Sequence, residues 1–225
     1  MKNIIAFSLW GENLMYWKGA VENIKLVKKY YQDFICRFYI DEKSRPDLIN
    51  MIQGDNVEVV LMQNNDTFKG MFWRFLASED PNVDIFLCRD CDSRISQREV
   101  DAVNEWLLSD KDFHIMRDHP CHAVPILGGM WGCRNNIMKD IQIGKLIENY
   151  GRYNYKGVDQ DFLRDIIYPI IKTKSFEHSE FNLNYGSTIY PFPTERINYE
   201  FVGEIYDENN NRNQDHINIL KNNKN

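Results

Sequence analysis

Short apolar runs alternate with helical patterns through the first half of the chain, and this alternation is what most constrains the fold. Each run is typical of a buried strand, and the segments between the runs carry apolar residues at helical spacing. Alternating strands and helices form right-handed βαβ units with a mostly parallel sheet, and strands that are apolar throughout are covered on both faces. We therefore predict an α/β fold in which helices flank a mixed, mostly parallel central sheet. The expected strands are residues 3–8, 34–40, 57–62, 83–88 and 113–116, and the expected helices are 16–31, 46–53, 68–77 and 97–108.

The second half of the chain is less regular. The stretch 122–134 is apolar but broken by glycines, and it is followed by helical patterns near 137–150 and 158–171. A segment punctuated by prolines then precedes a last strand candidate at 201–206. These elements extend the same α/β domain.

The end of the chain differs in composition from the rest. After Asp207 the sequence is rich in asparagine and too polar to bury. We predict a single domain over residues 1–207 and a frayed tail or linker over 208–225, which would lead to further domains of a longer parent chain.

Charge and composition exclude several classes of function. The 225 residues have a formal net charge of −6, with acidic and basic residues intermixed. A nucleic-acid-binding domain needs a basic face, so we predict no nucleic-acid partner, although a compact phosphate site needs only a few placed cations. The apolar run in MKNIIAFSLWGENL is too short for a signal peptide, and we expect no transmembrane segment. Five cysteines, mostly in or beside apolar segments, indicate reduced, buried thiols and a cytoplasmic protein.

Two aspartates follow the fourth expected strand in the sequence VDIFLCRDCDSRIS. Open α/β sheets place their ligand sites beyond the carboxyl ends of the strands, where Asp90 and Asp92 lie. Residues i and i+2 of an extended backbone point the same way, so the two carboxylates suit a hard divalent cation, Mg²⁺ or Mn²⁺, which would remove their mutual repulsion. The structural alternative is that Asp90 caps a turn and Asp92 caps the next helix, with the flanking arginines in surface ion pairs.

Candidate nucleotide contacts come from two other segments. The loop FSLWG exposes backbone groups at the same edge of the sheet, and its members Ser8, Leu9 and Gly11 can contact a base. The alternative is a plain turn in which Gly11 supplies an unusual φ angle. In TFKGMFWRFLA, Lys69 and Arg74 lie near a helix start, where a cation either meets a diphosphate or faces solvent.

Three further groups have both a chemical and a structural interpretation. Trp131, beside Gly129 in the glycine-rich stretch, either stacks on a sugar face or belongs to the core. Asp159 and Asp161 begin an expected helix. They are either acidic residues that the helix dipole favours at its N-terminus, or they supply a carboxylate base at the mouth of the pocket. His178 in FEHSEF is a lone imidazole, a type that is more often structural than a metal ligand.

Taken together, these segments resemble nucleotide-sugar-dependent glycosyltransferases with the GT-A fold, a Rossmann-like single domain. They are most similar to a group of small glycosyltransferases found in bacteria and in large DNA viruses, including chlorella viruses. The resemblance runs from FSLWG through RDCDSR, FHIMRDHPCH, GGMWGCR and GVDQDFL to PFPTER and FVGEIYD, and it stops before the Asn-rich tail. The order of RDCDSR, HIMRDHP and GGMWG is more specific than the aspartate pair alone.

The resemblance implies a role for each candidate residue. Asp90 and Asp92 would hold Mn²⁺ or Mg²⁺ against the diphosphate of the nucleotide-sugar, and His178 would be the third metal ligand. Arg94 would orient the carboxylates or meet the phosphates. The remaining candidates would contact the substrates. Ser8, Leu9 and Gly11 would line the nucleoside pocket, and Arg74 would lie on the base or phosphate side, near Lys69, whose place at a helix start lets it meet a diphosphate. Gly129 and Trp131 would face the donor sugar and acceptor, and Asp159, with Asp161 beside it, would act as base on the acceptor hydroxyl.

The implied function is metal-dependent transfer of a hexose or deoxyhexose from a UDP-sugar to a hydroxyl of a glycan acceptor. It would proceed with inversion, in the synthesis of a polysaccharide or a glycoprotein glycan, in the host cytoplasm if the chain is viral. If Asp159 only binds a sugar hydroxyl, a retaining mechanism becomes viable.

Two other functions stay open. A sugar-1-phosphate nucleotidyltransferase has a similar sheet and binds Mg²⁺ through aspartates, but FSLWGENLMYWKG lacks the usual glycine-rich loop with Arg and Lys. The other is a non-catalytic carbohydrate-binding module of a larger glycan-assembly protein, against which the intact aspartate pair argues.

Overall fold

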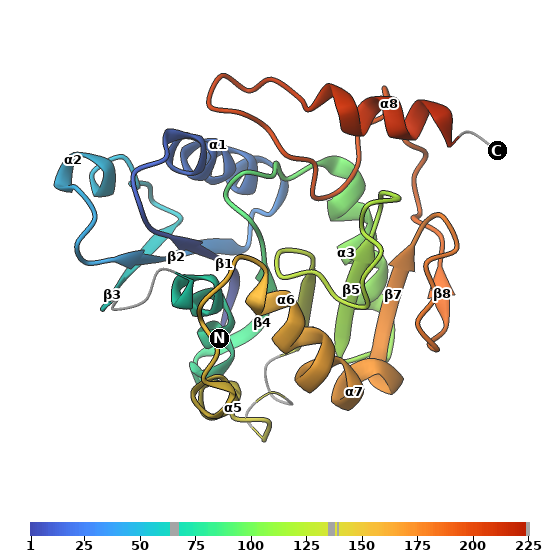
Figure 1. The fold of residues 1–225 in the computed structure, drawn as a ribbon, viewed down its shortest axis with the longest axis horizontal. Helices are drawn as coiled ribbons and strands as arrows, with labels where there is room; N and C mark the ends of the chain where they lie inside the picture. The colour runs from blue at the N-terminus through green and yellow to red at the C-terminus, as the bar shows by residue number, and fades with distance from the viewer. Residues whose placement is uncertain (64–67, 135–137, 139, 224–225) are drawn as a thin grey trace.

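An eight-stranded sheet forms the centre of the protein in a computed structural model that describes residues 1–63, 68–134, 138 and 140–223 (Figure 1). In the part of the chain so described, β6 is antiparallel to its two neighbours and the other paired strands are parallel. This confirms the prediction of an α/β fold with a mixed, mostly parallel sheet. In spatial order the strands are β3 (Val57–Met62), β2 (Phe34–Asp41), β1 (Lys2–Leu9), β4 (Val83–Cys88), β6 (Trp131–Arg134), β5 (Phe113–Arg117), β7 (Ser175–Ser179) and β8 (Ile189–Tyr190).

Helices cover both faces of the sheet because successive strand residues point to opposite faces and both sets are apolar. In β1, Ile5 and Phe7 join one buried cluster, while Ile4 and Ala6 join the other. The first cluster packs against α1 (Leu14–Tyr30), α2 (Pro46–Ile49) and α3 (Gln97–Leu108). The second packs against the 3₁₀ helix η1 (Lys69–Glu79), α5 (Ile143–Tyr150), and the continuous run of α6 (Val158–Phe162), a π turn (Leu163–Ile167) and α7 (Tyr168–Ile171).

Several expected elements differ from the observed ones. The helix expected at 46–53 ends at Ile49, and the one expected near 137–150 begins only at Ile143, with 137 and 139 outside the described residues. The strand expected at 201–206 does not form, because Gly203 has a φ of +81° and the N–H of Glu204 bonds back to the carbonyl of Phe201 in a turn. Strands β7 and β8 were not predicted.

The polar end of the chain folds against the domain, which corrects the expectation of a tail or linker over 208–225. Residues up to 223 are described, and they include α8 (Gln214–Asn222), drawn in red at the top of Figure 1. Asn213 caps this helix by accepting a hydrogen bond from the N–H of Asp215 at 2.9 Å, and Ile217 and Leu220 are buried. Two buried apolar side chains one helical turn apart, together with the ring contacts of His216 to His119 and Phe201, dock an otherwise polar helix.

A buried carboxylate ties the segment before α8 to the sheet. Asp118, just after β5, pairs with the guanidinium groups of Arg98 and Arg196 at 2.8 Å each. It also accepts a hydrogen bond from the N–H of Val202 at 2.8 Å. This contact fixes where the C-terminal segment crosses the carboxyl ends of the strands.

Two smaller findings complete the fold. Within the described residues, no helix is long and apolar enough to cross a membrane. All five cysteines are free thiols in this structure. Four of them are buried, as predicted, and Cys121 is exposed.

Candidate functional site

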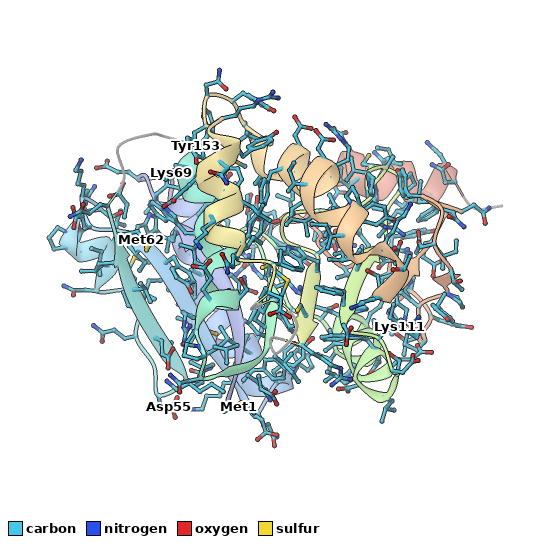
Figure 2. The ribbon with its side chains drawn as sticks, turned by 90° about the horizontal axis from the view of Figure 1, so that it is seen from below. Met1, Asp55, Met62, Lys69, Lys111 and Tyr153 are labelled. Carbon is cyan, nitrogen blue, oxygen red and sulfur yellow. The ribbon has the colours of Figure 1, made fainter. Side chains whose placement is uncertain are left out.

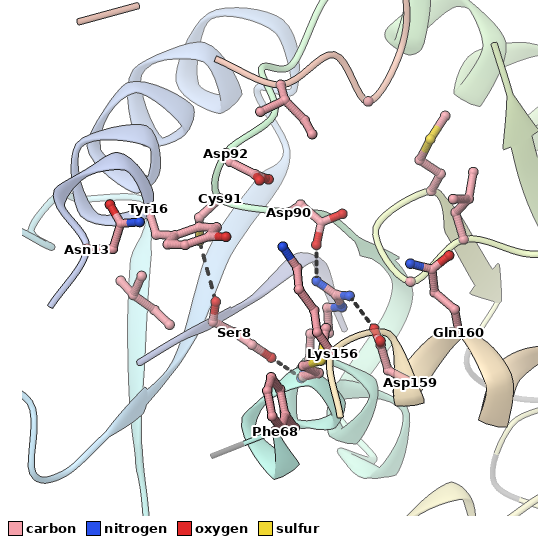
Figure 3. Close-up of a pocket in the computed structure, with 18 of the residues that line it drawn as sticks. Ser8, Asn13, Tyr16, Phe68, Asp90, Cys91, Asp92, Lys156, Asp159 and Gln160 are labelled. Atoms are coloured by element: carbon pink, nitrogen blue, oxygen red, sulfur yellow. Dashed lines mark hydrogen bonds and ion pairs between the residues drawn. The ribbon is translucent and has the colours of Figure 1, made fainter. Parts of the chain in front are cut away.

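A cavity of about 630 Å³ lies beyond the carboxyl ends of β1 and β4, where ligand sites of open α/β sheets are found (Figure 3). Its walls come from segments far apart in the sequence. The loop after β1 forms one wall, the loop after β4 another, and the C-terminal segment a third. The lining residues are Ser8, Leu9, Trp10, Gly11, Glu12, Asn13, Tyr16, Phe68, Met71, Arg74, Asp90, Cys91, Asp92, His119, Cys121, His122, Leu127, Gly128, Met130, Lys156, Asp159, Gln160, Phe201, Gly203, Ile205 and His216.

The two aspartates of RDCDSR both face this cavity (Figure 3). The turn that carries them is fixed by the carbonyl of Asp90, which accepts bonds from the N–H of Ser93 at 3.3 Å and from its hydroxyl at 2.9 Å. Burial, and then the charge of Asp90, raise the pKa of Asp92 to about 7. Among the described residues Asp92 takes part in no ion pair. The negative charge of the two aspartates is therefore only partly balanced within the described residues, as is expected of a carboxylate pair that binds a cation.

Arg74 connects Asp90 to Asp159 at the base of the cavity. Its guanidinium pairs with Asp90 through Nη1, and its Nη2 lies 2.8 Å from Oδ2 of Asp159. Ser8 orients the arginine by accepting a hydrogen bond from its backbone N–H at 3.0 Å. Burial lowers the pKa of Arg74, but the two carboxylates outweigh it and hold the pKa above the ordinary value, so Arg74 stays charged.

Two glycines allow these groups to come so close. A Cβ at Gly128 would lie 2.4 Å from both Arg74 Nη2 and Asp159 Oδ2, and one at Gly129 would lie 2.0 Å from Oδ2 of Asp90. Both would overlap charged groups that are held in place. The absence of side chains at Gly128 and Gly129 thus makes room for the carboxylates. Gly128 lines the cavity and Gly129 does not, which corrects the expectation that Gly129 itself lines the pocket.

Asp159 is the most buried of the three carboxylates. The residue is 1% exposed, and its Oδ1 atom has no hydrogen-bond partner among the described residues. Burial raises its pKa, against the opposing effect of Arg74. An unpartnered carboxylate oxygen at a cavity wall is suited to accept a hydrogen bond, or a proton, from a bound hydroxyl.

Besides Gly129, five of the predicted site residues lie outside the cavity lining: Lys69, Arg94, Trp131, Asp161 and His178. The ammonium of Lys69 lies over the ring of Tyr153, at 5.4 Å from its centroid (Figure 2). Trp131 is fully buried on β6, with ring centroids 5.6 and 5.3 Å from Phe75 and Phe86, so its core interpretation holds. Trp131 is therefore held in the core, and Lys69 is directed at Tyr153 and not into the cavity.

Arg94 and Asp161 are also turned away from the cavity. Arg94 donates to the carbonyls of Cys91 and Ser93 at 3.3 and 2.9 Å, and to the side chain of Asn210 at 2.9 Å, so it fastens the aspartate turn to the C-terminal segment. Asp161 accepts a hydrogen bond from the hydroxyl of Tyr155 and pairs with Arg164, each at 2.6 Å.

His178 does not join the aspartates. It is fully buried on β7, where its Nδ1 lies 2.8 Å from Nε2 of His114 and its Nε2 lies 3.0 Å from Oε2 of Glu105. Among the described residues, no group of three or more His, Cys, Asp and Glu side chains is arranged to hold a metal ion. A cation at Asp90 and Asp92 would have to take its other ligands from substrate and water.

The third wall was missed by sequence reasoning. It is a cluster of four rings, His119, His122, Phe201 and His216, in which the centroids of His119 and Phe201 are 4.4 Å apart and those of His119 and His216 are 5.2 Å apart. The sequence HIMRDHPCH could have indicated this wall, because His119 and His122 lie close together in it. His216 could not be found in this way, because it lies in the segment that was expected to be a tail.

Burial keeps His122 neutral, and this makes the stability of the fold depend on pH. Burial, and then the neighbouring His119, lower the pKa of His122 from 6.5 to about 3. Below pH 6.5 the unfolded chain therefore binds a proton that the folded chain does not, and stability falls as the pH falls toward 3. Replacing His122 with asparagine, whose Oδ1 can still accept the bond that His122 Nδ1 takes from the N–H of Asp118, removes this loss.

The expected effect is a difference between the two proteins in their response to acid. Between pH 7.5 and 5.5 the wild type should lose about 1.4 kcal/mol more free energy of unfolding than the variant. Urea denaturation of both proteins at the two pH values measures it. Identical responses to acid would show that His122 is not held neutral.

Comparisons with solved structures identify the fold. The chain is similar to a glycosyltransferase involved in the glycosylation of the major capsid of PBCV-1, with a TM-score of 0.52 and 14% sequence identity over 80% of this chain and 82% of that one. It is also similar to the galactosyltransferase LgtC, solved with donor and acceptor sugar analogs, with a TM-score of 0.52 and 15% identity over 78% and 73% of the two chains. A 4-diphosphocytidyl-2C-methyl-D-erythritol synthase from Anaerococcus prevotii gives a TM-score of 0.51 and 12% identity over 83% and 93%.

At these identities the likeness concerns the fold, and it confirms the predicted GT-A architecture. No protein-family model matches the sequence, and no curated protein matches it either.

Proposed function

We propose that this protein is a metal-dependent glycosyltransferase that moves a hexose or deoxyhexose from a UDP-sugar to a hydroxyl of a glycan acceptor. The observation that carries the proposal is the pair Asp90 and Asp92, which face a large cavity at the carboxyl end of β4 together with Arg74 and Asp159. Two glycosyltransferases with the same fold support it.

A divalent cation, Mn²⁺ or Mg²⁺, fits the aspartate pair. Asp92 takes part in no ion pair among the described residues, and its pKa is raised first by burial and then by the repulsion from Asp90, which a cation would remove. Mg²⁺ is commonly held by one or two carboxylates and completes its shell with substrate phosphates and water, which agrees with the absence of a third protein ligand among the described residues. When bound, such a cation stabilises the negative charge on a departing diphosphate.

The remaining residues position the substrates. The loop Ser8 to Gly11 offers backbone groups to the nucleoside. Arg74 holds Asp159 in place, and Asp159 Oδ1 accepts the proton of the acceptor hydroxyl as its oxygen bonds to the anomeric carbon. The bond from that carbon to the diphosphate oxygen breaks in the same displacement, the electron pair leaves with the nucleoside diphosphate, and the anomeric configuration inverts.

Nucleotide binding tests the proposal directly. Thermal unfolding is followed with UDP, GDP, CDP and dTDP, each with Mn²⁺ and with a chelator. UDP with Mn²⁺ is expected to raise the Tm by several degrees, because a ligand at 100 times its Kd stabilises the fold by about 2.7 kcal/mol. The chelator should abolish most of this shift. A protein that responds to none of the four nucleotides would contradict the enzyme proposal.

The nucleotidyltransferase alternative is separated by a second assay. The synthase from Anaerococcus prevotii shares the fold, so the fold does not distinguish the two reactions. A glycosyltransferase hydrolyses a UDP-sugar slowly to UDP and the free sugar. A nucleotidyltransferase instead releases pyrophosphate from UTP in the presence of a sugar 1-phosphate. Pyrophosphate release without UDP-sugar hydrolysis would favour the second function.

A further inference from the structure

Lys156 extends into the cavity from the loop before α6, opposite the aspartate turn. Figure 3 shows its side chain directed between Ser8 and Asp90. The turn that aims it depends on Gly157, whose φ of +91° is a conformation that other residues rarely adopt. Sequence analysis gave Lys156 no role and assigned the phosphate contact to Lys69, which lies over Tyr153 instead.

The ammonium of Lys156 forms no close ion pair within the described residues, although its charge acts on Asp92, whose pKa it lowers against the larger effects of burial and of Asp90. Of the described residues that line the cavity, Arg74 and Lys156 are the two with a lysine or arginine side chain. Arg74 is paired with both Asp90 and Asp159, whereas Lys156 has no carboxylate within 4.0 Å among the described residues. An ammonium aimed into a cavity without an ion-pair partner is available to an anionic ligand.

The cavity needs such a cation if it is to hold a diphosphate. Four carboxylates line it, those of Glu12, Asp90, Asp92 and Asp159, and they repel a phosphate group. A divalent cation at Asp90 and Asp92 offsets part of this charge, and Arg74 offsets another part. The diphosphate itself adds further negative charge, which a second cation on the opposite wall can meet.

We infer that Lys156 binds the diphosphate of the nucleotide substrate from the wall opposite Asp90 and Asp92, and that it stabilises the nucleoside diphosphate as it leaves. This inference rests on the proposed function, since it presupposes a nucleotide substrate. The long, flexible lysine side chain acts as a point charge and can follow the phosphates as the bond to the sugar breaks.

The test compares ligands with and without phosphates on matched variants. Calorimetric titrations in Mn²⁺ use UDP, UMP and uridine with the wild type, Lys156→Gln, Lys156→Arg and the control Lys145→Gln. Lys145 is exposed on α5 and lies outside the cavity lining. A hydrogen bond to a charged group contributes about 1.5–3 kcal/mol, so Lys156→Gln should weaken UDP binding about 10- to 100-fold.

The selectivity of the loss distinguishes phosphate binding from a structural role. Uridine should bind to Lys156→Gln as it does to the wild type, Lys156→Arg should keep most of the UDP affinity, and Lys145→Gln should bind all three ligands normally. Equal UDP affinity of Lys156→Gln and wild type would overturn the inference and leave the proposed function standing. Equal losses for uridine and UDP would also overturn it, because Lys156 would then act through the fold. A wild type that binds none of the three ligands would refute the UDP donor together with the role of Lys156.

Discussion

Replacing Asp92 with asparagine is expected to lower UDP-sugar hydrolysis at least 100-fold while making the metal-free protein more stable. The loss follows from the proposed cation site, because the amide carries no charge to hold a divalent cation and the departing diphosphate then lacks the charge of that cation. A transition-state contribution of about 2.7 kcal/mol corresponds to a factor of 100. Asp92→Asn should also abolish the Mn²⁺-dependent part of the UDP thermal shift.

The gain in stability follows from the sign of the pKa shift. The pKa of Asp92 is raised by burial and by Asp90 from 3.8 to about 7, so the folded protein binds this proton more tightly than the unfolded chain. Stability from this group is therefore complete below the unfolded pKa and is lost as the pH rises through 7. Because Asp92 is only half-buried, solvent screening reduces the effect, and we expect the asparagine variant to gain about 1–2 kcal/mol at pH 8.

Urea denaturation at pH 8 with a chelator measures the gain, and thermal shifts with UDP and Mn²⁺ measure the loss. The matched control is Asp84→Asn, an exposed aspartate on the same strand, β4, which should change neither quantity. An Asp92→Asn protein that keeps the metal-linked thermal shift would contradict the cation site. An Asp92→Asn protein that is less stable than the wild type at pH 8 would contradict the repulsion between Asp90 and Asp92, from which the cation site is inferred.

The sheet and the aspartate pair could be predicted because both depend on local sequence. Strand β4 and helix α3 have the predicted bounds, since an unbroken apolar run and an amphipathic pattern capped by Ser96 leave few alternatives. Asp90 and Asp92 follow an apolar strand directly, in a short turn. Their i, i+2 spacing therefore brings both carboxylates to one side, as predicted.

The i, i+2 spacing of Asp159 and Asp161 has the opposite result, because these residues begin a helix, as the sequence predicted. Residues two apart in an α-helix are separated by about 200° around the axis, so they face opposite sides. Asp159 points to Arg74 at the cavity wall, and Asp161 points outward to Tyr155 and Arg164. Only one residue of such a pair on a helix can face the cavity, and here that residue is Asp159.

The C-terminal wall could not be predicted because long-range contacts define it. The segment from Phe201 to Asn213 forms no regular strand or helix, and it is held by the bonds of Asp118 to Arg196 and to the N–H of Val202. The position expected for His178, beside the two aspartates, was wrong for a related reason. Its strand, β7, buries it beside His114 and Glu105, and the polar sequence SFEHS gave no sign that it would be a central strand.

Replacing Asp159 with asparagine should spare nucleotide binding and reduce hydrolysis of the UDP-sugar by a factor of about 100 to 10,000, the range typical of a lost general base. The Oδ1 atom of Asp159 has no partner among the described residues, and burial raises its pKa toward the range in which a carboxylate takes up a proton efficiently. Asparagine keeps the shape of the side chain but cannot accept that proton. The UDP-dependent thermal shift should persist because Asp90 and Asp92 are unchanged.

Asp161→Asn is the matched control, two residues away in the same helix. Its carboxylate contacts Tyr155 and Arg164 at the surface, so UDP release should stay within about threefold of the wild type, since surface substitutions change free energies by no more than about 0.5 kcal/mol. Initial rates of UDP release from the UDP-sugar are measured in parallel with UDP binding. Together they distinguish three roles of Asp159: base, ligand of a sugar hydroxyl, and support for Arg74. Normal release by Asp159→Asn would exclude it as the base and favour a retaining mechanism in which it only binds a sugar hydroxyl. Loss of binding together with release would instead show that Asp159 serves to hold Arg74, because a buried arginine that loses one of its two carboxylates no longer fixes Asp90 for the cation.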